Sequence, residues 1–234
     1  MIVWAGQSSD DLRMVVEHYP EQPRPQQRYE VQTMPGRNGE LLLAENAYNN
    51  YTQPYDVYLS AERIGLPRAA RAVAAWLCAP TGYQRLEDSY EPDVFRLAYF
   101  SGPLDISNVL NRFGRATLEF NCKPQRWLKE GEQTVTLTQS GAVLYNPGME
   151  ALPLITVYGT GPGTLTAGGR TVQIKSLDGS LTLDSEIQDA YKGTLNKNST
   201  ISAPEFPALP PGESAVAWTG GIQRVEIVPR WWVL

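Results

Sequence analysis

Histidine is almost absent from this sequence of 234 residues. The single histidine, His18, excludes a metal site built from several histidines. A serine hydrolase needs its histidine beside a nucleophile on a sharp turn, and no G-x-S-x-G motif occurs here. We therefore expect His18 to have a structural or surface role.

Cysteine and positive charge are also scarce. Cys78 and Cys122 are the two cysteines, and no C-x-x-C motif occurs, so we predict two buried, reduced thiols and no zinc or thiol redox site. Twenty Lys and Arg face 25 Asp and Glu, which gives a net charge of −5. Nucleic acids and anionic membranes bind basic surfaces, so we expect neither sequence-specific nucleic-acid binding nor membrane binding.

Long apolar runs are missing too. No stretch approaches the roughly 20 apolar residues of a membrane span. Residues 1–6 lack the basic start and the apolar run of a signal peptide. We expect the protein to be synthesised in a cytoplasm and to stay soluble.

Turn residues and alternating apolar residues dominate what remains. Gly and Pro number 20 and 18, and apolar residues alternate with polar ones in 29–33, 55–59 and 116–122. This period of two is typical of strands with one buried face. Residues 93–100 are apolar on both faces apart from Arg96, which predicts a central strand.

One helix is predicted over residues 67–77. Pro67 suits its first turn, alanines follow, and Pro80 and Gly82 end it. Val73, Trp76 and Leu77 share one face, which can pack on a sheet.

Two domains are expected, residues 1–130 and residues 131–234. Lys129 to Glu132 forms a short polar junction, and short strands separated by Gly- and Pro-rich turns follow it. The turns are predicted at 146–148, 159–163, 167–169, 178–179, 210–212 and 220–221. The fold class is therefore mainly β, with two β-sandwich-like domains and one α-helix in the first.

Two further segments carry motif-like features. Glu87, Asp88, Glu91 and Asp93 could serve a glycosidase or hold calcium, but a solvated loop is the preferred interpretation. Residues 159–163 resemble a dinucleotide-binding loop, yet no helix follows, so a hairpin turn is predicted. Neither segment provides a recognisable catalytic set, and we expect a protein that is not an enzyme and holds no cofactor or metal.

Aromatic residues are the better candidates for contacts. Trp231 and Trp232 are adjacent, so on a strand one faces the core and the other faces outward. We predict both as candidate ligand contacts, which leaves a carbohydrate-binding module as an alternative function. Residues 45–52 are predicted to be a polar loop rich in Tyr and Asn, which is a candidate contact surface.

Four segments taken in order resemble the distal tail proteins of siphophages. They are residues 35–41 with 55–58; the end of the helix with 82–93; residues 116–127, which carry an F-x-C-x-P strand end; and the turns at 146–148, 153–155, 159–161 and 206–212. Glu213 and Ser214 depart from the family, in which an Asn follows the Pro-Gly turn.

The resemblance implies a structural role in the tip of a long phage tail. It implies that residues 1–130 assemble as a six-fold ring around the tail channel, and that residues 131–234 form a galectin-like or carbohydrate-module-like β-sandwich outside it. The implied partners are other copies of the chain, the tail-tube protein, the tail-associated hub protein and, in some relatives, a receptor-binding protein or host glycan. The location is then the virion. Candidate subunit contacts are Arg37, Asn38, Tyr48, Tyr51, Arg85 and Tyr90.

Overall fold

The computed structural model describes residues 1–109 and 112–234. The chain forms two compact units, Met1–Arg126 with Leu234, and Trp127–Val233. Each unit has its own core of buried apolar residues. The boundary expected after residue 130 falls in a short 3-10 turn, η2 (Lys129–Glu132), which follows β10 (Phe113–Leu128).

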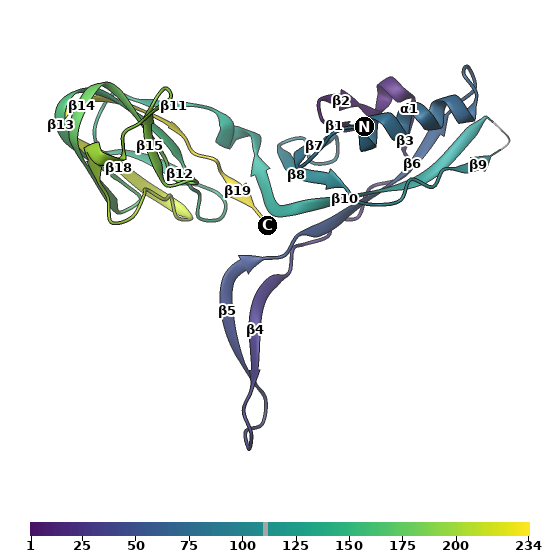
Figure 1. Cartoon of the computed structure of the whole chain (residues 1–234), viewed down its shortest axis with the longest axis horizontal. Coiled ribbons are helices and arrows are strands. Elements are labelled where there is room, and N and C mark those ends of the chain that lie inside the picture. Colours follow the sequence, from purple (N-terminus) through teal and green to yellow (C-terminus); the bar gives the residue numbers. More distant parts are fainter. Residues whose placement is uncertain (110–111) are drawn as a thin grey trace. The chain divides into compact units, whose positions relative to one another are not determined.

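An antiparallel sheet is the scaffold of the first unit (Figure 1). Its strands are ordered β2-β1-β7-β8-β10-β6-β3, and β9 pairs with β10. The longest pairing joins β10 to β6, from Phe113 opposite Ser60 to Cys122 opposite Tyr51. The bounds are β1 (Ile2–Trp4), β2 (Gln7–Ser8), β3 (Met14–Val16), β6 (Tyr51–Ser60), β7 (Gln84–Asp88), β8 (Val94–Phe100) and β9 (Ser107–Val109), with a 3-10 turn η1 (Ser9–Leu12).

The core of the first unit confirms the expected alternation. Leu118, Phe120 and Cys122 of β10 are fully buried, and Trp4 contacts Phe120 with ring centroids 4.9 Å apart. The predicted helix is α1 (Leu66–Cys78), which buries the expected face of Val73, Trp76 and Leu77. The expected central strand is also confirmed, because β8 lies between β7 and β10.

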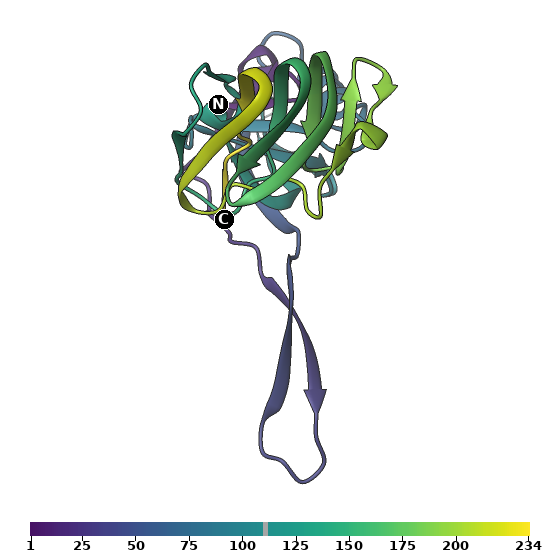
Figure 2. The ribbon, with the colours of Figure 1, turned by 90° about the vertical axis from the view of Figure 1, so that its left-hand side faces the viewer.

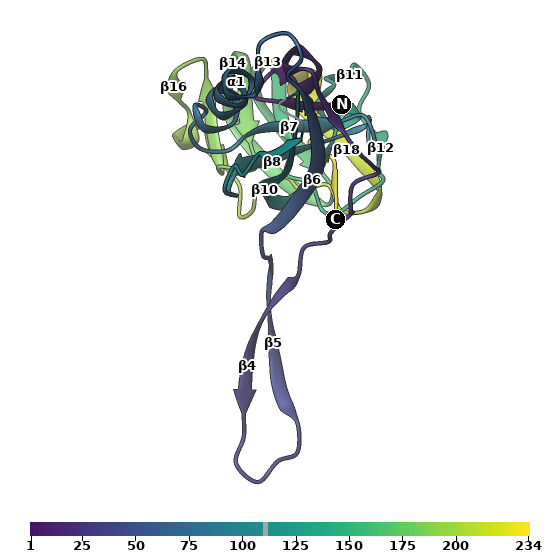
Figure 3. The same cartoon turned by 90° about the vertical axis from the view of Figure 1, so that its right-hand side faces the viewer.

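A separate two-stranded hairpin belongs to the first unit. It consists of β4 (Gln27–Thr33) and β5 (Glu40–Tyr48), which pair with each other in a ribbon that twists along its length (Figure 3). We call residues 27–48 the arm. The segment 35–39, which contains two glycines and an asparagine, lies at its tip. The predicted loop over 45–52 is wrong, because β5 continues to Tyr48 and β6 begins at Tyr51. Glu45 and Asn46 of β5 are exposed, so the sequence of this part of the strand is as polar as that of a loop.

Three long strands form the second unit, β13 (Leu154–Ala167), β14 (Arg170–Asp184) and β18 (Gly212–Val228), and they curve strongly (Figure 2). The strand order is β11-β18-β13-β14-β15-β16, with β12 on β18 and β17 on β14. The other bounds are β11 (Val135–Leu137), β12 (Ala142–Asn146), β15 (Asp189–Lys192), β16 (Leu195–Asn196), η3 (Asn198–Thr200), β17 (Ile201–Ser202) and β19 (Trp232–Val233).

Glycines explain why these strands bend without ending. The turns predicted at 159–163, 178–179 and 220–221 are wrong, since all three segments lie inside strands. A Cβ atom at Gly159 would lie 2.0 Å from the carbonyl oxygen of Gly221, and one at Gly221 would lie 1.7 Å from that of Thr160. The backbones approach so closely here that only glycine fits, and the pairing shifts by a bulge. The predicted turn at 167–169 is confirmed between β13 and β14.

Candidate assembly site: an exposed hairpin and its ionic base

The arm presents one apolar face. Val31 lies opposite Leu42 and Tyr29 lies opposite Ala44, so the four side chains share a face of the ribbon. Val31 is 50% exposed and Leu42 is 56% exposed. The other face is mixed, because Glu30 and Gln32 lie opposite Leu43 and Leu41. We call the Tyr29, Val31, Leu42 and Ala44 side the apolar face of the arm.

Hydrogen bonds fasten both ends of the arm to the sheet of the first unit. Before β4, Gln53 Nε2 donates to the Glu21 carbonyl oxygen at 2.7 Å, and Arg126 Nη2 donates to the Pro23 carbonyl oxygen at 2.7 Å. After β5, Asn50 Nδ2 donates to Tyr83 Oη at 2.7 Å and to Asn121 Oδ1 at 2.6 Å. The arm therefore starts from a fixed base.

Buried charges form that base. Arg96 Nη1 lies 2.9 Å from Asp88 Oδ2, and both side chains are 2% exposed. Glu91 joins the pair to Arg126, because its carboxylate contacts Arg96 and lies 3.1 Å from Arg126 Nη1. Tyr55 Oη donates to Asp88 Oδ2 at 2.7 Å. We call Asp88, Glu91, Arg96 and Arg126 the ionic base.

The solvated loop predicted for the acidic residues is therefore wrong for Asp88. Asp88 Oδ1 accepts hydrogen bonds of 2.9 Å from the backbone N–H groups of Tyr90 and Glu91, while its Oδ2 meets Arg96. Full pairing of this kind is what makes a buried carboxylate tolerable. Arg96 was the sequence signal for this cluster, because a charge inside an otherwise apolar central strand needs a buried partner. Arg126 gave no comparable signal.

Burial and charge shift the pKa values of groups around the base. Burial, followed by the charge of Asp88, raises the pKa of Tyr55 well above its ordinary value. Burial acts to lower the pKa of Arg96. The net shift is upward, because the pKa is raised by its neighbours Tyr55, Tyr51, Asp88 and Glu91. Burial raises the pKa of the Cys122 thiol to about 12. The tyrosines and the thiol therefore stay neutral at physiological pH, while the guanidinium stays charged.

The six candidate subunit contacts fall in four places. Arg37 and Asn38 are exposed at the tip of the arm. Tyr48 ends β5 and is half-buried, whereas Tyr51 is 7% exposed and its hydroxyl accepts from Arg126 Nε at 3.3 Å. Tyr90 lies near the ionic base, where its ring meets Tyr19 edge-on. Arg85 is on β7, paired with Glu87 and lying 3.8 Å above the ring of Phe95.

The two candidate ligand contacts differ in exposure. Trp231 is 5% exposed and belongs to the core of the second unit. Trp232 is half-buried, and its Nε1 donates to the carbonyl oxygen of Glu150 at 2.9 Å. The prediction of two buried thiols is wrong for Cys78, which is exposed at the end of α1. His18 is on the surface, with Nε2 3.2 Å from Asp56 Oδ2.

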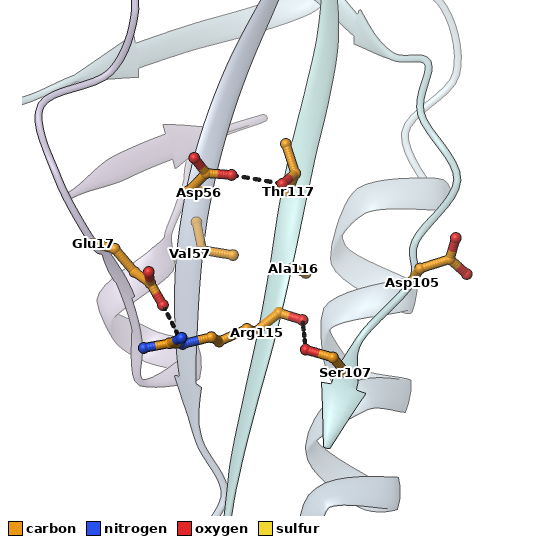
Figure 4. A pocket seen from close by; sticks show the side chains of 8 residues that line it. All are labelled: Glu17, Asp56, Val57, Asp105, Ser107, Arg115, Ala116 and Thr117. Atoms are coloured by element: carbon orange, nitrogen blue, oxygen red, sulfur yellow. Dashed lines mark hydrogen bonds and ion pairs between the residues drawn. The ribbon is translucent and has the colours of Figure 1, made fainter. Parts of the chain in front are cut away.

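A polar hollow of about 330 Å³ lies over β6 and β10 (Figure 4). Two of its three carboxylates have partners within the chain. Glu17 pairs with Arg115 at 2.8 Å, and Asp56 accepts a hydrogen bond of 2.5 Å from Thr117. Asp105 points away from the other carboxylates. Within residues 1–109 and 112–234, no group of three or more His, Cys, Asp or Glu is placed to hold a metal ion. No helix of the described chain is long and apolar enough to cross a membrane.

Comparison with known proteins identifies the part of the chain that carries the arm. Residues 9–122, which include the arm and most of its base, match the family described as "Phage tail protein RIFT-related domain". This segment is a phage tail protein domain. The protein therefore has a structural role in a phage tail and is a component of the virion.

The fold of the whole chain is similar to that of a phage protein of known structure. It matches the crystal structure of SPP1 Dit (gp 19.1) with a TM-score of 0.77 and 13% identity, over 97% of this chain and 96% of that chain. That protein is described as a paradigm of the hub adsorption apparatus in phages that infect Gram-positive bacteria. No relative among curated proteins matches the sequence.

Two predictions are confirmed by these likenesses. The resemblance to siphophage distal tail proteins is confirmed by the family match and by the fold. The fold class, mainly β with one helix in the first unit and a galectin-like second unit, is confirmed by the structure and by its likeness to SPP1 Dit.

Proposed function

We propose that this phage tail protein is a distal tail protein that closes into a six-fold ring at the end of the tail tube. In this proposal the first unit builds the ring, and the ring links the tail-tube protein to the tail-associated hub protein. The second unit lies on the periphery for docking or adhesion. The chain is made in the host bacterial cytoplasm and has no enzymatic activity of its own.

The apolar face of the arm is the observation that carries this proposal. An isolated two-stranded ribbon is marginally stable in water, and this one exposes Val31 and Leu42 at 50% and 56%. Covering that face with protein would remove apolar area from water, which is favourable by about 25 cal/mol for each Å². A second copy of the chain is the partner that a ring provides.

The base of the arm suits a directional contact. A ring closes when one surface of a copy meets a different surface of the next, at a fixed rotation. Asn50, Gln53 and Arg126 hold the arm where it leaves the sheet. Its direction is then set within each copy, and we infer that Arg37, Asn38 and Tyr48 contact the neighbouring copy along the arm.

Native mass spectrometry of the purified chain tests the ring. We expect a hexamer for the natural chain and a monomer for Val31→Asp, because the charge lies on the apolar face of the arm. Gln32→Asp is the matched control, since Gln32 is the next residue on the opposite face, and it should leave the hexamer intact. A natural chain that is monomeric at every concentration, or a Val31→Asp variant that still forms hexamers, would contradict the proposal.

The location within the tail needs a separate measurement. Antibodies raised against the second unit should label the distal end of the tail in electron micrographs of intact virions. Label along the tube or at the head would contradict the tail-tip location, whatever the oligomeric state of the isolated chain.

A further inference from the structure

A cavity of about 400 Å³ lies in the second unit. Ligand sites in proteins have volumes of about 300–1,000 Å³, so the cavity has room for a small molecule. It is lined by Leu152, Arg170, Ser185, Gln188, Ala203, Pro204, Glu205 and Phe206.

The bend of β14 creates this cavity. Arg170 is the first residue of the strand, and Ser185 directly follows the last. In a straight strand the two residues would be about 50 Å apart, at about 3.4 Å for each residue. Because β14 curves, both residues line the same cavity.

The guanidinium of Arg170 is fixed by two carboxylates and one carbonyl oxygen. Its Nε lies 3.1 Å from Glu205 Oε2, its Nη2 lies 3.5 Å from Glu150 Oε1, and its Nη1 donates to the Phe206 carbonyl oxygen at 3.3 Å. Two carboxylates thus surround one guanidinium, which leaves an excess of negative charge. This balance opposes an anionic ligand such as a phosphate ester and suits a neutral one.

Further polar groups complete the lining. Ser185 is 2% exposed, and its hydroxyl makes no hydrogen bond to any other residue within 1–109 and 112–234. A buried hydroxyl without a partner is unfavourable, so a ligand that reaches it gains a hydrogen bond. Gln188 adds an exposed amide, held at a φ of 54° by the turn after β14.

We propose that this cavity binds one neutral hexose unit of a saccharide. A sugar hydroxyl donates and accepts at once, which matches a lining of guanidinium, carboxylate, amide and hydroxyl groups. The C–H face of a sugar ring is apolar, and Leu152, Pro204 and Phe206 supply an apolar surface beside those polar groups. Trp232 is next to the site through Glu150, whose backbone it contacts and whose side chain meets Arg170.

Saturation-transfer NMR of the full chain tests the proposal. The probes are glucose, galactose and N-acetylglucosamine, with glycerol 3-phosphate as the anionic comparison. We expect transfer to at least one hexose and none to the phosphate ester. Arg170→Lys keeps the charge but loses the planar fork of donors, so it should weaken hexose binding at least tenfold.

Two variants separate loss of binding from loss of fold. Gln188→Gly removes the amide at a backbone conformation that suits glycine, and it should also weaken binding severalfold. Arg224→Lys changes an exposed ion pair with Glu226 outside the cavity and should bind as the natural chain does. The proposal is wrong if no hexose binds, if glycerol 3-phosphate binds instead, or if both cavity variants bind normally. None of these outcomes depends on whether the chain forms a ring.

Discussion

Arg126 Nη2 donates a hydrogen bond of 2.7 Å to the carbonyl oxygen of Pro23, in the segment that leads into the arm. The same guanidinium lies 3.1 Å from Glu91 and 3.3 Å from the hydroxyl of Tyr51. A single side chain, 1% exposed, thus joins the start of the arm to the ionic base. The position of the exposed arm therefore depends on buried charges at its base.

Removing this guanidinium should destabilise the first unit. Breaking a buried ion pair by deleting one partner costs about 3–5 kcal/mol, because the remaining charge stays buried. For Arg126→Met we expect about 3 kcal/mol in urea denaturation, since Glu91 retains Arg96 as a partner. Arg28→Met, which breaks an exposed pair with Glu45, should cost less than about 1 kcal/mol. Equal effects of the two variants would show that the ionic base is not a stabilising feature.

Because the backbones approach closely at Gly221, replacing this glycine should destabilise the second unit. In Gly221→Ala the new Cβ would lie 1.7 Å from the carbonyl oxygen of Thr160, so the paired strands must separate. Overpacking of this kind costs about 1–3 kcal/mol and more where backbone must move. Gly141→Ala is the control, because it has open space and carries only the cost of a φ of 91°. We expect Gly141→Ala to lower the free energy of unfolding by about 1 kcal/mol, which is less than the effect of Gly221→Ala. Denaturation followed by tryptophan fluorescence measures both variants.

The two thiols should react at very different rates. Cys78 is exposed, whereas Cys122 is fully buried with a pKa raised to about 12 by burial. Because the thiolate is the reactive form, we expect an aromatic disulfide reagent at pH 8 to modify one thiol in the native chain and two in urea. Cys78→Ser should abolish the native reaction. A second fast thiol in the native chain would contradict the burial of Cys122.

Acid should weaken the second unit through Asp184. Its carboxylate forms two hydrogen bonds with Arg230, at 2.7 Å and 3.2 Å. Burial alone would raise the pKa of Asp184, but the hydrogen bonds and charge of Arg230 lower it from the ordinary value of 3.8. A lowered pKa in the folded state means that the stabilisation is complete above the unfolded-state pKa and is lost as pH falls through the folded-state pKa.

The variant Asp184→Asn isolates this effect. We expect it to lose about 1.5–3 kcal/mol near pH 7, as for hydrogen bonds to charged groups. The difference from the natural chain should shrink as the pH falls below 3.8 and then through the lowered folded-state pKa, because the natural carboxylate becomes protonated as well. Thermal unfolding monitored from pH 2 to pH 7 measures both values. A difference that stays constant over this range would rule out the titration of Asp184 as its cause.

Local sequence patterns predicted the elements that have one buried face and one solvent-exposed face. The alternation in 116–122 predicted β10, and the stripe of Val73, Trp76 and Leu77 predicted the buried face of α1. The patterns failed where glycine has a different role. The glycines at 159–163 and 220–221 look like turns in the sequence, but they permit a close approach between strands that are far apart along the chain. That role depends on the partner strand, which no local pattern contains.

The sequence alone determined that this chain is β-rich, carries one helix, and resembles a tail component, because these properties follow from periodicity, turn residues and the order of segments. The tertiary structure alone decided that Asp88 and Arg96 are buried together, that Arg126 reaches Pro23, and that the two ends of β14 line one cavity. Burial and pairing are set by contacts through space. Those contacts exist only once distant parts of the chain have folded against one another.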